Sequence, residues 1–327
     1  MAYIEINKSN LLYNLEKIRN TTNSEILAVI KDNAYGHGIL HVAKILSENG
    51  IRKVCVRNNY EAELVKHLFD EILVFFPTFQ RNGMNISYTI SDISQLKKPR
   101  HKKIHLKFDT GMHRNALSLD NIDEILELAF SKFEVKGVFS HFCCSDEVGC
   151  DTFIQLDKFK KLKEKIISYC KENNYEIPKF HIANSDAIGK IDEYFDYVRP
   201  GIAIYGGISG FKPVMKLVAK VLKTQKISKN QFVGYNKKYM FDKEEIISLI
   251  DLGYSDGILY FDKELRLKDT IAVGKISMDS MMVIGEFDEV VVFDDIKEFI
   301  KNYPYTITYD ILTKLKPNIK RVIVEEN

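Results

Sequence analysis

The sequence lacks a run of apolar residues long enough to cross a bilayer, and its N-terminus lacks the pattern of a secretory signal peptide. It also lacks a charge excess, because 47 basic and 45 acidic residues leave a net charge of +2. A nucleic-acid-binding protein needs a concentrated basic face, and the one basic cluster, residues 97–103, is typical of a solvated loop before a strand. We therefore expect no membrane and no nucleic acid among its partners.

Cysteine is scarce and is not arranged for cross-linking or for zinc. The number of cysteines is odd, two are adjacent, and no CxxC pair occurs. A disulfide framework favours even, regular spacing, and a structural zinc site needs a second paired cluster of Cys or His. The pattern argues against both and predicts reduced thiols in the cytoplasm and no metal site. The cysteines are Cys55, Cys143, Cys144, Cys150 and Cys170.

Between residues 26 and 199, short apolar strands alternate with amphipathic segments of helical period. The clearest helices are predicted at 39–47, 121–131 and 155–172. Strands separated by helices in this way are typical of a small (β/α)₈ barrel, and a doubly wound open sheet with similar spacing is the alternative. The predicted strands are residues 26–30, 53–56, 72–76, 86–90, 104–108, 135–139, 179–182 and 197–199.

The two ends of the chain do not show the alternation of strands and helices seen between them. A short strand at 3–6 precedes a helix that Ser9 and Asn10 can cap. After Gly207 the segments are mostly strand-like, with one short helix predicted at 309–315. We predict a barrel at residues 9–208 and a mostly-β domain formed by residues 1–8 and 209–327. The strand-like segments of that domain are 214–221, 246–251, 270–276, 281–284 and 289–293.

Polar side chains follow five of the predicted barrel strands. The carboxyl ends of barrel strands meet at one rim, where catalytic groups lie. A lysine at such a rim can form a Schiff base with a carbonyl compound, whereas an isolated lysine at a strand end is more often a solvated surface residue. Five polar strand ends together favour a catalytic rim. These groups are Lys31, the segment 109–114, His141, the pair Asn184 and Ser185, and Arg199.

Two turns have the character of an anion site. Gly36 and Gly38 permit positive φ and close backbone approach, and Tyr35 before them offers a hydroxyl. In VRPGIAIYGG, residues 198–207, backbone N–H groups after the proline can bind an anion. Ser185 can donate to a phosphate or, in the ordinary case, cap a helix. Together these features predict a phosphate-binding rim.

Six motifs carry a resemblance to a known family, and they stand in the family's order between residues 28 and 282. Through them the chain resembles the alanine racemases, pyridoxal-phosphate (PLP) enzymes built from a TIM barrel and a β domain. The resemblance covers nearly the whole chain and implies PLP as cofactor, a small amino-acid substrate, and interconversion of L-alanine and D-alanine for peptidoglycan. The motifs are AVIKDNAYGHG, KFDTGMHR, SHFCCSDE, HIANSDA, VRPGIAIYG, and the pair DLGYSDG and GKISMDSMM.

The resemblance implies two catalytic bases. Lys31 matches the lysine that carries PLP and acts on the D-amino acid. Tyr254 matches the tyrosine that acts on the L-amino acid, which in this family comes from the partner subunit of a homodimer. Racemisation removes a proton from one face of the α-carbon and returns one to the other, so two acid–base groups on opposite faces suffice.

The resemblance also implies binding residues. Arg199 matches the arginine at the pyridine nitrogen, and a guanidinium, which only donates hydrogen bonds, favours an unprotonated nitrogen. Arg114 matches the arginine that binds the substrate carboxylate, and Lys107 matches a lysine that is carbamylated in some members. The other implied contacts are Tyr35, Asn184, Ser185, Gly201 and Ile202 for the phosphate, Met278 with Asp279 beside it for the substrate carboxylate, and His141 near the ring.

Several residues depart from the family pattern and leave the substrate range open. Asp32 stands where a small apolar residue usually follows the lysine, and His113 replaces a glycine. Pro317 replaces a tyrosine that lines the entrance, and the segment from Asn318 to Arg321 blurs an Arg-Val-x-Arg sequence. An amino-acid racemase of broader range, for serine or lysine, is therefore one alternative.

Two further alternatives come from other classes. Decarboxylases of basic amino acids share the barrel, but they place an acidic residue at the pyridine nitrogen, which Arg199 argues against. A non-catalytic PLP carrier has no β domain, whereas residues 208–327 here hold Tyr254 and Met278. A non-catalytic protein that only binds a partner would not need the lysine, the tyrosine and both arginines that this chain contains.

Overall fold

The computed structural model describes residues 1–78, 83–97, 102–147 and 149–325. The chain divides into two compact units. The barrel unit comprises Leu15–Asp32 and Val42–Ala203, and the β unit comprises Met1–Asn14, Asn33–His41 and Ile204–Asn327. The predicted domain boundaries at residues 8–9 and 208–209 stay a prediction, and the basic cluster at 97–103 lies partly outside the described residues.

The barrel unit contains a closed barrel of parallel strands, so the (β/α)₈ prediction is confirmed and the open sheet is wrong. Strands pair in chain order, and the last pairs with the first through Tyr197 and Glu25. Each predicted strand is present, with its ends shifted by a few residues. The barrel strands are β2 (Glu25–Val29), β3 (Lys53–Val56), β4 (Glu71–Val74), β5 (Ile86–Ile90), β6 (Lys103–Lys107), β7 (Glu134–Phe139), β8 (Lys179–His181) and β9 (Tyr197–Val198).

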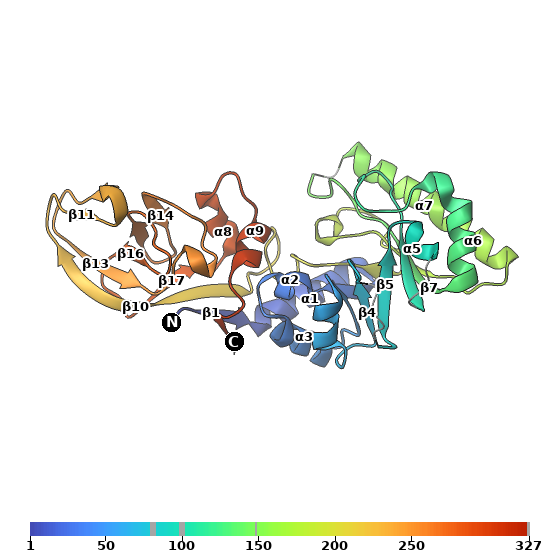
Figure 1. The fold of residues 1–327 in the computed structure, drawn as a ribbon, viewed down its shortest axis with the longest axis horizontal. Helices are drawn as coiled ribbons and strands as arrows, with labels where there is room; N and C mark the ends of the chain where they lie inside the picture. The colour runs from blue at the N-terminus through green and yellow to red at the C-terminus, as the bar shows by residue number, and fades with distance from the viewer. Residues whose placement is uncertain (79–82, 98–101, 148, 326–327) are drawn as a thin grey trace. The chain divides into compact units, whose positions relative to one another are not determined.

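Helices cover the outside of the barrel, which explains why its strands read as apolar runs. All five residues of β5 are buried. Figure 1 shows α6 and α7 along the outside of the barrel, and they are joined by an ion pair between Lys165 and Asp123. The helices are α1 (Lys8–Thr22), α3 (Ile39–Glu48), α4 (Asn59–Val65), α5 (Ser94–Lys97), α6 (Ile122–Lys132) and α7 (Cys150–Glu172).

The β unit is built on one mixed sheet that includes the N-terminal strand β1 (Tyr3–Asn7), as predicted. β1 pairs antiparallel with β10 (Met215–Ile227) and parallel with the C-terminal strand β18 (Lys320–Val324), which the sequence did not predict. Figure 1 shows β10 running the length of this unit. The other strands are β13 (Glu245–Ile250), β14 (Glu264–Arg266), β15 (Ile271–Val273), β16 (Met281–Ile284) and β17 (Glu289–Phe293).

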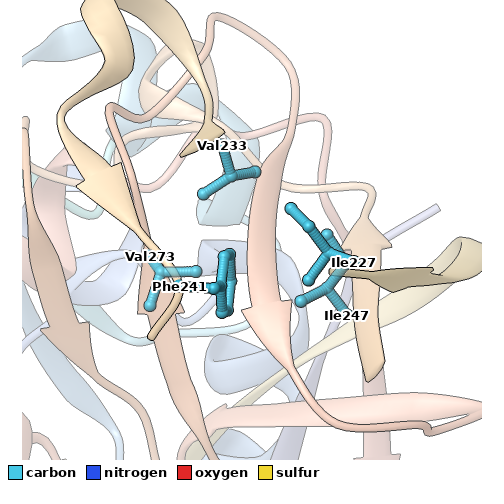
Figure 2. Packing of buried hydrophobic residues seen from close by; sticks show 5 residues of the cluster. All are labelled: Ile227, Val233, Phe241, Ile247 and Val273. Atoms are coloured by element: carbon cyan, nitrogen blue, oxygen red, sulfur yellow. The ribbon is translucent and has the colours of Figure 1, made fainter. Parts of the chain in front are cut away.

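A compact apolar cluster stabilises the part of this sheet that contains β13, β15 and the end of β10. Side chains from β10, β13 and β15 meet Val233 of β11 (Phe232–Val233) and Phe241, the residue after β12 (Tyr239–Met240). Figure 2 shows Phe241 close to Val273, with the isoleucines on the other side of the cluster. Burial of such side chains stabilises the fold by about 1.5–3 kcal/mol each. The cluster residues are Ile227, Val233, Phe241, Ile247 and Val273.

The segment α2 (Lys31–Tyr35) has an unusual backbone. Its last four residues, 32–35, have φ between 51° and 55°, and Gly36 follows with φ of 80°. This is a left-handed turn, which costs about 1–2 kcal/mol for each residue other than glycine. The sequence predicted positive φ at Gly36 and Gly38 only, so the four preceding residues are a finding of the structure.

Arg321 fixes the end of this left-handed turn. Its Nε and Nη2 donate to the carbonyl oxygen of Gly36 at 3.2 and 2.8 Å. Its Nη1 donates to the carbonyl oxygens of Lys316 and Pro317, both at 2.8 Å. The side chain is buried, and its hydrogen bonds to Gly36 form away from water. The segment that departs from the family pattern thus keeps one arginine, and that arginine supports the turn beside Lys31.

We predict that Arg321→Met lowers the free energy of unfolding by about 2–4 kcal/mol. The variant leaves the buried carbonyl group of Gly36 and the part-buried carbonyl groups of Lys316 and Pro317 without a charged donor, and an orphaned buried group costs about 1–3 kcal/mol. Urea unfolding measures the change. Arg52→Met is the matched control, because Arg52 is exposed. An equal loss in both variants would contradict the anchoring role of Arg321.

Candidate active site

The predicted site residues fall into two groups, one in each unit, and Lys31 begins the first group. It directly follows the end of β2, where Ile30 N–H donates to the carbonyl oxygen of Cys55 and Val29 N–H to that of Pro200, at 2.9 and 2.8 Å. These bonds pin the backbone of the lysine to β3 and to the segment after β9. The side chain is 34% exposed, so its amine remains accessible.

Asp32 lies between two cations. Its Oδ2 is 3.7 Å from Lys31 Nζ, and its Oδ1 accepts a hydrogen bond from Arg57 Nη1 at 2.9 Å. No role for Asp32 was predicted from the sequence. In the structure the Asp32 carboxylate places a negative charge beside the Lys31 amine. Its hydrogen bond with Arg57 holds it toward β3.

Arg199 is buried beside the end of β9, with 3% of its surface exposed. It approaches His181 Nδ1 at 2.6 Å and donates to the carbonyl oxygens of Ser140 and Ile182 at 2.6 and 3.1 Å. Burial lowers the pKa of Arg199 to about 10, which leaves it charged at neutral pH. No carboxylate in the described ranges forms an ion pair with it, so a structural salt bridge does not explain this arginine.

His141 lies next to this guanidinium, as predicted. Its Nδ1 is 3.4 Å from Arg199 Nη2. Burial first, and then the charges of Arg199, Arg114 and Lys107, lower the pKa of His141 to about 3. The imidazole is therefore neutral and can accept a hydrogen bond at neutral pH.

Lys107 and Arg114 flank a tight turn after β6. Lys107 Nζ donates to the carbonyl oxygen of Arg114 at 3.4 Å. Burial, followed by the charges of Arg114 and Arg199, lowers the pKa of Lys107 to about 8. The Arg114 side chain is exposed and pairs with no carboxylate that the structure describes. His113 has φ of 55°, in the left-handed region that glycine adopts most readily.

Ser185 is held against the segment after β9. Its Oγ accepts hydrogen bonds from the N–H groups of Gly201 and Ala203 at 2.9 and 3.2 Å. Asn184, not Ser185, caps the following turn, because its Oδ1 accepts from Ala187 N–H at 3.2 Å. Within the described residues the Ser185 hydroxyl proton and the N–H of Ile202 have no acceptor. Both remain able to donate to an anion.

The second group lies in the β unit. Tyr254 is 42% exposed and opens a short turn whose N–H groups donate to the carbonyl oxygens of Ser277 and Met278. Ser255 Oγ donates to Asp279 Oδ1 at 2.9 Å, which ties the two motifs together. The structure thus brings the predicted catalytic tyrosine next to the predicted carboxylate-binding residues of this unit.

Tyr35 packs in an aromatic cluster of the β unit. Its ring centroid is 5.2 Å from that of Tyr205 and 5.9 Å from that of Tyr309 on α9 (Thr308–Lys314). His37 stacks on Tyr205 at 4.5 Å. The sequence did not predict these partners, although the aromatic residues at the ends of two motifs were a usable signal.

Sequence reasoning also missed the residues behind Arg199. His181 contacts the guanidinium directly, and His105 and Glu71 continue from it into the barrel. Their signal was weak but present, since histidines at 105 and 181 interrupt otherwise apolar barrel strands. Among the described residues no group of three or more Cys, His, Asp or Glu could hold a metal ion.

The sequence also predicted reduced cysteines and no membrane-spanning segment. Of the cysteines that the structure describes, Cys55 and Cys170 are free and buried, and Cys143 and Cys144 are free and exposed. No helix in the described part of the chain is both long enough and apolar enough to span a membrane.

Comparison with known proteins gives full-length matches. Two family models, "Alanine racemase, N-terminal domain" and "Alanine racemase, C-terminal domain", match residues 6–209 and 214–323. The chain is 37% identical to an alanine racemase of Campylobacter concisus and 34% identical to one of Nitratiruptor, with 99% of this chain and 100% of each relative covered.

Solved structures agree with the sequence relatives. An alanine racemase of Clostridium difficile 630 has a TM-score of 0.89 at 27% identity, with 100% of this chain and 96% of that chain covered. The alanine racemase of Streptomyces lavendulae has a TM-score of 0.86 at 26% identity, with 100% and 97% covered. The chain therefore belongs to the alanine racemase family of isomerases.

Proposed function

We propose that the protein is an alanine racemase that uses PLP to interconvert L-alanine and D-alanine, and that it supplies D-alanine for peptidoglycan. The observation that carries this proposal is Arg199, a buried cation at the barrel rim without a carboxylate partner in the described chain. A carboxylate is what decarboxylases of this barrel type place at the pyridine nitrogen. We infer a cytoplasmic location from the cysteine pattern, and this stays a prediction.

The chemistry of the donor set fits PLP. Lys31 supplies an accessible amine at the rim, and the Ser185 hydroxyl and Ile202 N–H are free to donate to a phosphate. When bound, PLP withdraws electrons from the α-carbon of an amino acid and so acidifies its proton. The protein binds the phosphate, orients the ring and provides the groups that move the proton.

Two bases on opposite faces complete the reaction. Lys31 Nζ takes or returns the α-proton on the face of the D-amino acid, and Tyr254 Oη does so on the face of the L-amino acid. We propose that the protein is a homodimer and that the partner subunit's Tyr254 completes each site. Exposure of Tyr254 and Met278 supports this, because both side chains are available to a second subunit.

Arg199 would limit how strongly the PLP ring withdraws electrons. A guanidinium can only donate, so it keeps the pyridine nitrogen unprotonated and makes the ring a weaker electron sink. We propose that this limits side reactions such as loss of carbon dioxide. Arg114 and the N–H of Met278 would hold the substrate carboxylate, with Asp279 fixing the turn of Tyr254 through Ser255.

We propose that Lys107 is carbamylated and so gives Arg114 an anionic neighbour. Only the neutral amine, formed when the ammonium group loses a proton, attacks carbon dioxide. The nitrogen bonds the carbon, one C=O π pair moves to oxygen, and the nitrogen releases a second proton, so the group's charge changes from +1 to −1 with two protons released. Because the pKa of Lys107 is lowered to about 8, the neutral amine dominates above pH 8 and falls tenfold for each pH unit below.

We expect ¹³C-bicarbonate to give a carbamate signal in the NMR spectrum that grows between pH 7 and 9. Lys107→Ala should remove this signal, while the exposed control Lys44→Ala should keep it. A signal that persists in Lys107→Ala would contradict the assignment.

The direct test of function is chiral separation of the products from L-alanine. A racemase must reach equal amounts of the two enantiomers, because enantiomers have equal free energy. Release of carbon dioxide instead would identify a decarboxylase. Serine and lysine belong in the same assay, since Pro317 in place of the entrance tyrosine favours a broader range as the second candidate.

A further inference from the structure

A chain of four polar side chains crosses the interior of the barrel; we call it the relay. Glu71 Oε1 lies 2.9 Å from His105 Nε2, His105 Nδ1 lies 3.0 Å from His181 Nε2, and His181 Nδ1 lies 2.6 Å from Arg199 Nη1. Glu71 opens β4 and Arg199 follows β9, so the relay runs from the amino-terminal end of the barrel to its catalytic rim. Barrel interiors are normally filled by branched apolar side chains.

The hydrogen bonds of the relay can point in one direction only. A guanidinium has no acceptor, so Arg199 donates to His181 Nδ1. That nitrogen is therefore unprotonated, and a neutral His181 carries its proton on Nε2, which donates to His105 Nδ1. His105 then carries its proton on Nε2 and donates to Glu71, which as a carboxylate can only accept. The charged groups at the two ends fix the tautomer of both histidines.

The barrel makes room for the relay. Gly137 on β7 lies against the His105 ring, and a Cβ at this glycine would come within 2.3 Å of His105 Nδ1. The Phe139 ring is stacked on His181, with centroids 4.9 Å apart and an interplanar angle of 6°. Ser87 Oγ donates to Glu71 Oε1 at 3.1 Å. Two strands, β5 and β7, therefore shape their interior side chains around the relay.

The ends of the relay carry opposite charges. Burial works to raise the pKa of Glu71, but the interactions with His105, Ser87 and Lys53 outweigh it and lower that pKa to about 2. The pKa of His181 is lowered far below its usual value by burial and by Arg199. Glu71 is therefore anionic, His181 is neutral and Arg199 is cationic, although Arg199 touches no carboxylate in the described chain.

We propose that Glu71 and His105 are positioning residues, which act through His181 to hold Arg199 as a donor toward the cofactor ring. With Glu71 in place, His181 Nδ1 always offers Arg199 a lone pair. In the opposite tautomer His181 would direct an N–H at the guanidinium and displace it from the ring. This inference rests on the proposed role of Arg199 at the pyridine nitrogen.

The first test is ¹⁵N NMR of the cofactor-loaded enzyme labelled in histidine. His105 and His181 should each show an unprotonated Nδ1 and a protonated Nε2. The two signals are assigned from His105→Gln and His181→Gln. A protonated Nδ1 at either histidine in the wild-type enzyme would overturn the proposal. The two variants serve only to assign the signals, and the result does not depend on activity.

The second test removes the acceptor at the far end. We expect Glu71→Leu to lose the single tautomer and to lower kcat by about 10–100-fold with KM nearly unchanged, as is usual for residues that orient a functional histidine. Glu71→Gln keeps an acceptor oxygen at the same volume and should retain the tautomers and most of kcat. Glu25→Leu is the control, because Glu25 opens strand β2, two strands away, at the same end of the barrel and contacts Lys53.

The two proposals can fail separately. If Glu71→Leu keeps the wild-type tautomers, or keeps kcat within twofold of Glu25→Leu, the relay has no positioning role. If the wild-type protein shows the predicted tautomers but does not racemise alanine, the relay is present and the proposed function is wrong.

Discussion

Lys31→Ala should lose the visible absorption band of bound PLP and should racemise alanine at least about 10⁴-fold more slowly than the wild-type protein. The reason is that one side chain has two tasks. The Lys31 amine carries the cofactor, and it moves the α-proton on one face of the substrate. The backbone bonds of Val29 and Ile30 fix this lysine at the rim, so a lysine elsewhere does not replace it.

The measurement combines absorbance spectra with a D-alanine to L-alanine assay. Borohydride should abolish the band in the wild-type protein. Lys44→Ala is the control, since Lys44 is an exposed lysine on the helix that follows the same loop. A band that survives in Lys31→Ala, or a variant with full activity, would contradict the assignment of Lys31.

Tyr254→Phe should keep the visible band and still lose racemisation by about 10²–10⁴-fold, the range expected for one general acid–base group. The substitution removes only the hydroxyl, and the turn that presents residue 254 is held by backbone bonds to Ser277 and Met278. Both directions of racemisation should slow equally, because the equilibrium constant between enantiomers is one.

Tyr260→Phe is the matched control for this variant. Tyr260 is 56% exposed and lies in the same unit, six positions further along the chain. The control should keep full activity. Equal losses in the two variants would mean that the tyrosine hydroxyls act on stability rather than on the reaction.

The barrel could be predicted from the sequence because its signal is local and repeated. The strands are largely buried on both faces and so appear as apolar runs, and several of these runs are followed by a helix of clear amphipathic period. The rim residues could be predicted for the same reason, since a strand end is readable from where an apolar run stops. β18 was missed because Lys320 and Arg321 obscure a short edge strand.

The left-handed turn after Lys31 could not be predicted in the same way. Asp32 and Asn33 tolerate positive φ, but Ala34 and Tyr35 do not favour it. The carbonyl group at the end of the turn is bound by Arg321, which lies far along the chain. Strained backbone of this kind persists only where the surroundings hold it in place. The motif was recognisable, but its geometry is a tertiary effect.

The relay could not be predicted from the sequence either, because it depends on side chains that meet only in the folded barrel. His105 and His181 are separated by 76 residues and meet only because their strands face the same barrel interior. A single polar residue within an apolar strand has many ordinary explanations. The directed hydrogen bonds became visible only when both ends, Glu71 and Arg199, were placed.

The central claim is that Lys31 and Tyr254 act on opposite faces of the α-carbon, and hydrogen exchange in the Tyr254→Phe variant tests it most directly. In D₂O, ¹H NMR should show the α-proton of D-alanine exchanging with solvent, because Lys31 still acts on that face, while the α-proton of L-alanine is retained. Exchange of L-alanine with retention of the D-alanine proton, or equal exchange of both enantiomers, would contradict the two-base account.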